Sequence, residues 1–355
     1  MDIKIYQLVP DPYNMGNPYV SSLMDEISAT YNNIKWGYGL DGFWTNDIYS
    51  FDIIHIHWPN LLLNSRYYNK EEIEKRLDDI KKRGIKIVVT CHNLEPHYTT
   101  NKDKKDVYVI VYSRADVFIH LGKYSLDTMS TKYSQAKHVV IYHHTYDKLY
   151  HIVSREDSIK HLKLDPQKKY ILCFGAFRDK EERNLVDKAL SVFREKGIDI
   201  LAPNYYKIDK KRNVLVVISQ WFKCKLKNVF TPGLHINGWF VRNDDLPYYY
   251  GASDIALLHR VKILNSGNLP MAFLMGKVVV GPNVGNVGKI LKETGNPVFE
   301  VDNQQSLIDA INEAFTLTKD LKNEENQKYA IKYFSTTVIS KQLYDLYCSI
   351  QLEDY

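Results

Sequence analysis

Short apolar runs alternate with amphipathic segments along the first half of the chain. The stretch IKIVVTCHNLEPH, residues 85–97, begins with an apolar run containing β-branched residues, which is typical of a strand covered on both faces. Similar runs occupy residues 3–9, 51–58, 116–122 and 138–144. Residues 17–31 and 69–84 have a helical pattern, and the second segment ends at Gly84, a residue suited to the position after a helix. A β–α–β series of this kind predicts a parallel sheet.

The alternation restarts after a charged, irregular stretch at residues 147–168. Strands are expected at residues 168–177, 198–203, 214–219, 234–240, 254–259, 277–282 and 297–301. Helices are expected at residues 181–197, 303–322 and 336–352. Because the two halves share this architecture, the sequence predicts an α/β protein with two Rossmann-like domains, an N-terminal one at residues 1–150 and a C-terminal one at residues 165–330.

The composition is that of an ordinary globular protein. The chain has 355 residues, enough for two domains with separate cores, and its 45% hydrophobic and 25% charged residues argue against the disordered and fibrous classes. A formal net charge of +5 is only mildly basic, which argues against a dedicated nucleic-acid binder. The four cysteines lie far apart without a CxxC pair, as is typical of reduced thiols in the cytoplasm.

Targeting signals and basic clusters bear on where the protein acts. The first residues, MDIKIYQLVPDPY, have no signal-peptide pattern, and no apolar run reaches the length of about 18 residues expected of a membrane span, so we expect a cytoplasmic protein. Basic clusters lie at residues 81–86, 102–105, 210–212 and 223–227. They fit solvated helix ends and loops. The alternative is a peripheral contact with an anionic membrane, to which each cation near the surface contributes about 1 kcal/mol.

Polar residues follow two of the predicted strands in the first half. His92, Glu95 and His97 come directly after the strand at residues 85–90, at the sheet edge where α/β proteins bind ligands. The alternative is a capped, hydrogen-bonded turn. His55 and His57 share one face of their strand, and Trp58 follows them. The pattern does not indicate a zinc site, because HxH has no third ligand at suitable spacing.

Two stretches in the second half have features of a phosphate site. Arg178 and Lys180 follow a strand and precede a helix, so cations and helix amides would meet at one place and could bind a diphosphate. The alternative is a charged helix start with local ion pairs. In NSGNLP, residues 265–270, Ser266 and Gly267 open a predicted helix, and glycine allows a phosphate to approach the backbone.

Several stretches together resemble a known family. They are HIHWPN at residues 55–60, TCHNLEPH at 90–97, ADVFIHLGKYS at 115–125, FGAFRDK at 174–180 and the segment 243–285. In this order they resemble GT-B glycosyltransferases, in particular bacterial enzymes that build capsular, exopolysaccharide or O-antigen repeat units. The resemblance implies two Rossmann-like domains facing across a cleft. It also implies that the helix at about residues 335–355 packs back on the N-terminal domain.

The resemblance also implies roles for individual residues. The nucleotide-sugar donor would be bound by Arg178, Lys180, Asn265, Ser266, Gly267 and Asn268. The acceptor would be bound by Asn17, His57, Trp58 and His97. Candidates for the base that removes the acceptor proton are Glu95, His92 and Asp11.

The sequence departs from the large retaining families at the donor site. Those families carry a Glu-x7-Glu pair, and the corresponding positions here hold Ile263 and Met271. A retaining mechanism is therefore not implied. Relatives usually have a lysine where this chain has Glu181, which weakens the assignment of Lys180.

The resulting expectation is a metal-independent glycosyltransferase that moves one sugar from a UDP- or GDP-sugar to a glycan or lipid-linked glycan in bacterial surface polysaccharide synthesis. No cofactor is expected, because the chain has no DxD triplet and cationic side chains can neutralise the leaving diphosphate. Two alternatives remain open: a nucleotide-sugar epimerase on the same scaffold, and a non-catalytic partner protein that keeps the fold.

Overall fold

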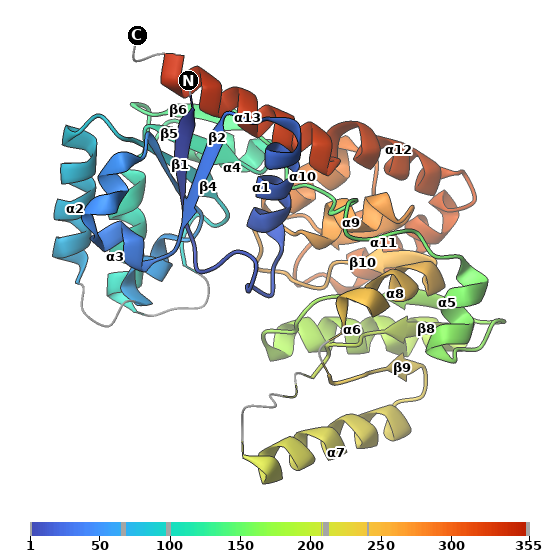
Figure 1. Cartoon of the computed structure of the whole chain (residues 1–355). Coiled ribbons are helices and arrows are strands. Elements are labelled where there is room, and N and C mark those ends of the chain that lie inside the picture. Colours follow the sequence, from blue (N-terminus) through green and yellow to red (C-terminus); the bar gives the residue numbers. More distant parts are fainter. Residues whose placement is uncertain are drawn as a thin grey trace. The chain divides into compact units, whose positions relative to one another are not determined.

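The computed structural model describes residues 2–64, 69–96, 101–206, 208, 213–239 and 241–352. The chain forms two compact units. The first comprises Met1–Tyr146 together with Tyr333–Tyr355, and the second comprises Asp147–Lys332. Each unit is built on one six-stranded sheet with helices on its faces (Figure 1).

The sheet of the first unit is parallel and has the order β2-β1-β3-β4-β5-β6. Its strands are β1 (Ile3–Leu8), β2 (Ile34–Tyr38), β3 (Ile53–Ile56), β4 (Lys86–Cys91), β5 (Val117–His120) and β6 (Lys137–Val140). The chain runs from β1 outward to β2 and then returns to β3 on the other side of β1. The switch point of this sheet, where loops diverge and ligands bind in such folds, therefore lies at the carboxyl ends of β1 and β3.

The helices of the first unit include one from the far end of the chain. They are α1 (Tyr19–Thr30), α2 (Lys70–Lys82), α3 (Lys102–Tyr112), α4 (Lys123–Met129) and α13 (Thr336–Leu352), with the 3₁₀ turns η1 (Asp41–Trp44), η2 (Asn46–Ser50) and η3 (Pro59–Asn64). Helix α13 packs against α1, where the rings of Tyr344 and Tyr31 stack with centroids 3.5 Å apart. The hydroxyl of Tyr344 donates to Asn33 Oδ1 at 3.1 Å.

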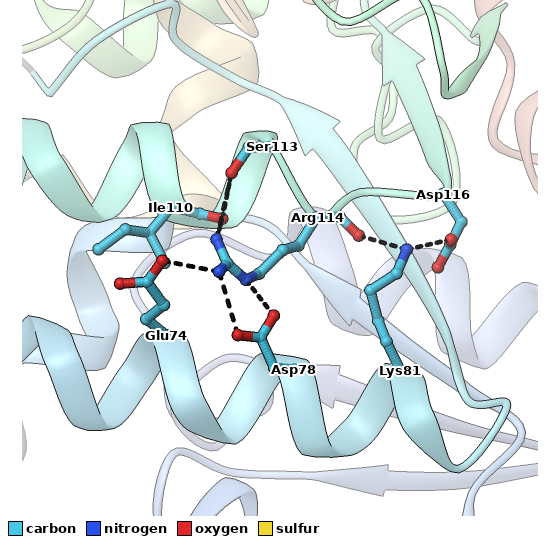
Figure 2. A network of polar contacts seen from close by, with 7 residues as sticks. All are labelled: Glu74, Asp78, Lys81, Ile110, Ser113, Arg114 and Asp116. Carbon is cyan, nitrogen blue, oxygen red and sulfur yellow. Dashed lines mark hydrogen bonds and ion pairs between the residues drawn. The ribbon is translucent and has the colours of Figure 1, made fainter.

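Ion pairs attach α2 to the segment between α3 and β5 (Figure 2). Arg114 donates to Asp78 Oδ1 and to Glu74 Oε1, both at 2.7 Å. The guanidinium of Arg114 holds the pKa of the Asp78 carboxyl below its usual value. Lys81 at the end of α2 pairs with Asp116 in the same network. This lysine, from the basic cluster at residues 81–86, therefore has a structural ion-pair partner.

The second unit repeats the architecture with the order β12-β11-β10-β7-β8-β9. Its strands are β7 (Lys169–Leu172), β8 (Ile198–Leu201), β9 (Leu234–His235), β10 (Ile255–Leu257), β11 (Val278–Pro282) and β12 (Val298–Phe299). Its helices are α5 (Arg155–Leu162), α6 (Lys180–Phe193), α7 (Val214–Phe230), α8 (Leu246–Ala252), α9 (Asn268–Leu274), α10 (Gly285–Glu293), α11 (Gln304–Leu317) and most of α12 (Lys322–Phe334), with η4 (Arg194–Lys196) and η5 (Asn243–Asp245). The switch point lies between β7 and β10.

Two local expectations from the sequence are wrong. Residues 214–219, VLVVIS, form the first turns of α7 instead of a strand, because the side chain of Asn213 accepts a hydrogen bond from Leu215 N and caps a helix. A short apolar run does not by itself separate strand from helix. The stretch at residues 147–168, expected to be irregular, contains α5, which Ser154 caps in the same way. No helix in the described ranges is long and apolar enough to cross a membrane.

Candidate functional site

Polar side chains gather at the switch point of the first sheet. Gln7 lies near the end of β1 and is paired in register with His55 on β3. His57 follows β3, and His92 follows the adjacent strand β4. These side chains converge because β1, β3 and β4 are parallel neighbours that end at the same edge.

These groups form one hydrogen-bonded chain with the C-terminal helix. Nε2 of His92 lies 3.3 Å from Nδ1 of His57, and Nε2 of His57 lies 2.9 Å from Oε1 of Gln7. Gln7 Nε2 donates to the hydroxyl of Tyr347 on α13 at 3.3 Å. The Tyr347 hydroxyl lies 2.6 Å from Nδ1 of His55, whose Nε2 lies 2.7 Å from Thr90 Oγ1.

The amide of Gln7 determines where the protons lie. Its Oε1 can only accept a hydrogen bond, so His57 must donate from Nε2 and carries its proton there. Nδ1 of His57 then accepts a hydrogen bond from Nε2 of His92. The Tyr347 hydroxyl accepts from Gln7 Nε2 and donates to Nδ1 of His55, and the Nε2–H of His55 donates to Thr90 Oγ1. Every donor thus points the same way along the chain, an arrangement in which hydrogen bonds strengthen one another. His92 carries its lone pair on Nδ1.

Burial keeps these imidazoles neutral. It lowers the pKa of His55 to about 3, and it lowers the pKa values of His57 and His92 well below the ordinary value. The hydrogen-bonded chain therefore consists of uncharged donors and acceptors. Such groups can orient a hydroxyl and accept its proton.

A second group of side chains surrounds His92. The ring of Trp58 stacks on His92 with centroids 4.7 Å apart, and the buried ring of Tyr19 lies 5.0 Å from it. Tyr19 N donates to Asn17 Oδ1 at 3.1 Å. The hydroxyl of Tyr146 donates to the same oxygen, also at 3.1 Å. Asn17 and Trp58, both predicted to bind the acceptor, therefore lie in or beside the histidine cluster.

Two further histidines complete this edge, and the sequence pattern did not single them out. His144 Nε2 lies 3.1 Å from the carbonyl oxygen of Tyr19, and Nε2 of His143 lies 3.4 Å from the Tyr146 hydroxyl. Burial lowers the pKa of His143 to about 4. The available signal was the pair HH directly after the apolar run at residues 139–142, since His92 likewise follows a predicted strand.

The other candidates of the first half lie in different surroundings. The side chain of Glu95 is 73% exposed and pairs with Lys105, with 3.8 Å between Oε2 and Nζ. Asp11 accepts from Tyr13 N at 3.0 Å and from the amide of Asn14, within its own loop. His97 lies outside the described residues. Of the three base candidates, the structure therefore brings His92 alone into the hydrogen-bonded chain described above.

Three loops meet at the switch point of the second sheet. Asn268, at the start of α9, donates from Nδ2 to the carbonyl of Phe174 at 2.8 Å. Arg260, which follows β10, donates from Nη2 to the carbonyl of Ala176 at 3.1 Å. Gly175 has φ +108°, and a Cβ atom there would lie 2.9 Å from Asn268 Nδ2, so this position needs glycine. Arg260 is a cation at this edge that the sequence pattern did not single out.

The start of α6 differs from the expected arrangement. Asp179 caps the helix by accepting from Glu182 N at 3.0 Å, and Glu182 Oε2 accepts from Arg178 N at 2.7 Å. Glu182 is fully buried, which raises the pKa of its carboxyl. These two amides are already satisfied, so Arg178 can contribute its side chain but not its amide to an anion site. Lys180 lines a cavity of about 360 Å³ together with Glu181 and residues 299–304.

The remaining donor candidates lie along the loop from β10 to α9. Asn265 Oδ1 accepts from Asn286 Nδ2 at 2.7 Å, which attaches this loop to α10. Gly267 precedes α9, and the carbonyl of Ser266 accepts from Leu269 N at 3.2 Å. Within the described ranges, no cluster of three or more His, Cys, Asp or Glu side chains could hold a metal ion.

Comparison with known proteins bears on the fold. No protein-family model matches the sequence, and no curated protein sequence matches it. The structure is similar to sucrose-phosphate synthase from Thermosynechococcus elongatus, with a TM-score of 0.73 at 14% identity over 99% of this chain and 100% of that chain. It is also similar to HepE from Anabaena in complex with UDP-glucose, with a TM-score of 0.70 at 12% identity over 98% of this chain and 100% of that one.

A third similarity is to a Listeria monocytogenes protein assigned as a UDP-N-acetylglucosamine 2-epimerase. Its TM-score is 0.61 at 11% identity, over 100% of this chain and 98% of that one. Solved structures similar to this chain over almost its full length thus include GT-B glycosyltransferases. The chain has the two-domain α/β fold of these proteins, which confirms the fold class predicted from the sequence.

Proposed function

We propose that the protein is a glycosyltransferase that moves one sugar from a UDP- or GDP-sugar to a hydroxyl of a glycan or lipid-linked glycan in bacterial surface polysaccharide synthesis. The observation that carries the proposal is the directed hydrogen-bonded chain that includes His92 at the switch point of the first sheet. A neutral imidazole with its lone pair on Nδ1 suits a group that must orient a hydroxyl and take its proton.

In the proposed reaction the acceptor hydroxyl gives its proton to Nδ1 of His92 while its oxygen attacks the anomeric carbon of the donor sugar. The bond from that carbon to the diphosphate oxygen breaks, and the nucleoside diphosphate leaves with the electron pair. This is a direct displacement, so the product has inverted configuration. The bond from His92 to His57 holds the ring in place. Because the pKa of His92 is low, its contribution as a base should lie toward the lower end of the usual range of about 10² to 10⁴ in rate.

The second unit would bind the donor through cations and backbone groups. Arg178 and Arg260 would neutralise the diphosphate, and Asn268 and the close backbone at Gly175 would position it. Charge-assisted hydrogen bonds of this kind contribute about 1.5–3 kcal/mol each. We therefore propose a metal-independent reaction in which these groups neutralise the leaving diphosphate.

Calorimetric titration with UDP, GDP and their common sugar conjugates tests the donor site, with EDTA and again with magnesium. Saturable binding of one nucleotide in EDTA is expected. If no nucleotide binds in either buffer, the proposal fails and the non-catalytic partner becomes the better description of the protein.

The role of His92 is tested by comparing His92→Gln with Glu95→Gln and Asp11→Asn. His92→Gln should reduce turnover with little change in nucleotide affinity, whereas the other two variants should stay near wild type because those carboxylates are engaged elsewhere. A loss of turnover confined to Glu95→Gln or Asp11→Asn would transfer the base to that carboxylate.

An epimerase is the second candidate, and the similarity to the Listeria protein favours keeping it. An epimerase converts the nucleotide sugar itself and needs no acceptor. Incubation of a bound nucleotide sugar without glycan, followed by analysis of the sugar released on hydrolysis, separates the two functions. A changed sugar would identify an epimerase, and an unchanged sugar supports transfer.

A further inference from the structure

Helix α7 presents a large apolar surface to solvent. Cys224 is the one residue of this 17-residue helix that is buried. The exposed apolar side chains are Val214, Leu215, Val216, Ile218, Trp221, Phe222, Leu226, Val229 and Phe230. Leu215 is 75% exposed and Phe230 is 79% exposed. In Figure 1 the helix lies at the edge of the second unit, beyond β9. Exposed apolar groups scattered singly need no explanation, but a contiguous group of this size marks an interaction surface.

One face of α7 holds the helix on the unit. Asn228 donates from Nδ2 to the carbonyl of Ile236 at 2.8 Å and accepts from Ile236 N at 2.9 Å. Lys227 pairs with Asp187 of α6 at 3.1 Å. The thiol of Cys224 lies against Gly238, where a Cβ atom would be only 2.6 Å from the sulfur. These contacts fix the orientation of the helix, so the opposite face is held toward solvent.

The opposite face is a continuous apolar stripe. Leu215, Ile218, Phe222, Leu226 and Val229 follow one another at spacings of three and four residues, which places them on one side of a helix. Two exposed lysines, Lys223 and Lys225, lie next to this stripe. The helix contains no acidic residue. It therefore combines an apolar stripe with a positively charged margin.

We propose that α7 docks the protein on an anionic phospholipid bilayer, with the stripe inserted at the level of the headgroups and Lys223 and Lys225 reaching the lipid phosphates. A helix with an apolar face and lysines at its edges lies in the membrane interface in this way. The absence of acidic residues from α7 suits an anionic surface. A second copy of this chain is disfavoured as the occupant, because two such stripes in contact would bring their lysines together without carboxylates from α7 to pair with them.

Flotation with lipid vesicles tests the docking surface. The full chain is mixed with vesicles of phosphatidylcholine alone and of phosphatidylcholine with an equal amount of phosphatidylglycerol. We expect binding to the anionic vesicles, weaker binding to the neutral ones, and loss of binding as ionic strength rises. The double variant Lys223→Gln, Lys225→Gln should bind the anionic vesicles about twenty-fivefold more weakly, at about fivefold per lysine.

The apolar stripe is tested with the double variant Leu215→Gln, Phe222→Gln. Binding should fall by at least about tenfold, because each glutamine replaces an apolar side chain whose removal from water favours membrane binding. The matched control is Ile331→Gln on α12, because Ile331 is 55% exposed and Phe222 is 56% exposed. This control should bind like the wild type. Unchanged thermal unfolding in all variants would show that the fold is retained, as expected for side chains that face solvent.

Trp221 provides a direct reporter within α7. Its fluorescence should be quenched by vesicles with brominated acyl chains, and Trp221→Phe should remove most of that quenching. Equal binding to both kinds of vesicle, or a stripe variant that binds like the wild type, would overturn the proposal. So would a concentration-dependent dimer that the Leu215→Gln, Phe222→Gln variant abolishes. Vesicle binding does not depend on nucleotide binding, so this test stands or falls separately from the proposed transferase activity.

Discussion

Replacing Tyr347 by phenylalanine should interrupt the hydrogen-bonded chain between Gln7 and His55. The substitution keeps the ring that α13 packs against the sheet and removes only the hydroxyl. That hydroxyl accepts from Gln7 Nε2 at 3.3 Å and lies 2.6 Å from Nδ1 of His55. All three side chains are almost fully buried, so no water is expected to replace the lost partner.

The expected cost follows from the two groups left unsatisfied. A buried polar group without a partner costs about 1–3 kcal/mol, so with two such groups Tyr347→Phe should lower the free energy of unfolding by about 2–6 kcal/mol. The matched control is Tyr344→Phe on the same helix. Its hydroxyl donates to Asn33 Oδ1 at 3.1 Å and also interacts with Cys348, but the residue is partly exposed and water can replace these partners, so about 1 kcal/mol or less is expected.

Urea unfolding followed by circular dichroism measures the two costs, and nitrogen NMR of the histidine rings reports the tautomers. In Tyr347→Phe, the Gln7 amide loses the partner that fixes its orientation, so the ring signals of His55 and His57 should change. Tyr344→Phe should leave both rings unaffected. If Tyr347→Phe is no more destabilising than Tyr344→Phe and the ring signals match those of the wild type, the directed chain does not exist as described.

Three further predictions concern the donor edge, acid stability and backbone fit. Arg178→Ala and Arg260→Ala should each weaken nucleoside diphosphate binding by about tenfold or more in calorimetry. Arg242→Ala, which removes an exposed arginine paired with Asp244, should not weaken it. Burial lowers the pKa values of three well-buried imidazoles of the first unit, His55 to about 3, His120 to about 4 and His57 in the same direction. Their contribution to stability is complete above about pH 6.5 and is lost as pH falls, because the unfolded chain then binds protons that the folded chain does not. The free energy of unfolding should therefore decrease by about 1.4 kcal/mol per imidazole for each pH unit, and a value that stays constant down to about pH 5 would contradict this. Gly175→Ala should lower the melting temperature and weaken nucleotide binding, since alanine is strained at φ +108° and its Cβ meets Asn268.

Strands β1, β3, β4 and β5 could be predicted because each is a short, largely buried apolar run. Strand β2, IKWGY, is mostly not buried, and the sequence pattern predicts no strand there. The same topology places His57 and His92 together, since neighbouring parallel strands end at one edge. The sequence did not predict that Tyr347 joins them, because it lies 292 positions from His55 and no local pattern reports such a contact. It also did not predict that Glu95 turns outward to Lys105, which depends on the packing of α3.

Helix α7 shows a different limit of sequence reasoning. Its first six residues have the composition of a strand, but they lie on a helix where Val214, Leu215, Val216 and Ile218 are exposed. The Asn213 cap and the anchoring contacts of Asn228 favour a helix over a strand here. Neither residue is part of the apolar run. An apolar run can therefore indicate a strand where the chain forms a helix with an exposed apolar face.

The two switch points have the same topology but opposite chemistry, and this contrast supports the division of roles. The edge of the first sheet offers neutral imidazoles whose charged forms are suppressed by burial, so it is poorly suited to hold a diphosphate and well suited to hold hydroxyl groups. The edge of the second sheet offers Arg260, the side chain of Arg178 and a close backbone at Gly175, which suit an anion. An acceptor sugar carries hydroxyl groups and a nucleotide sugar carries a diphosphate. The chemistry of each edge is therefore consistent with the substrate proposed for it.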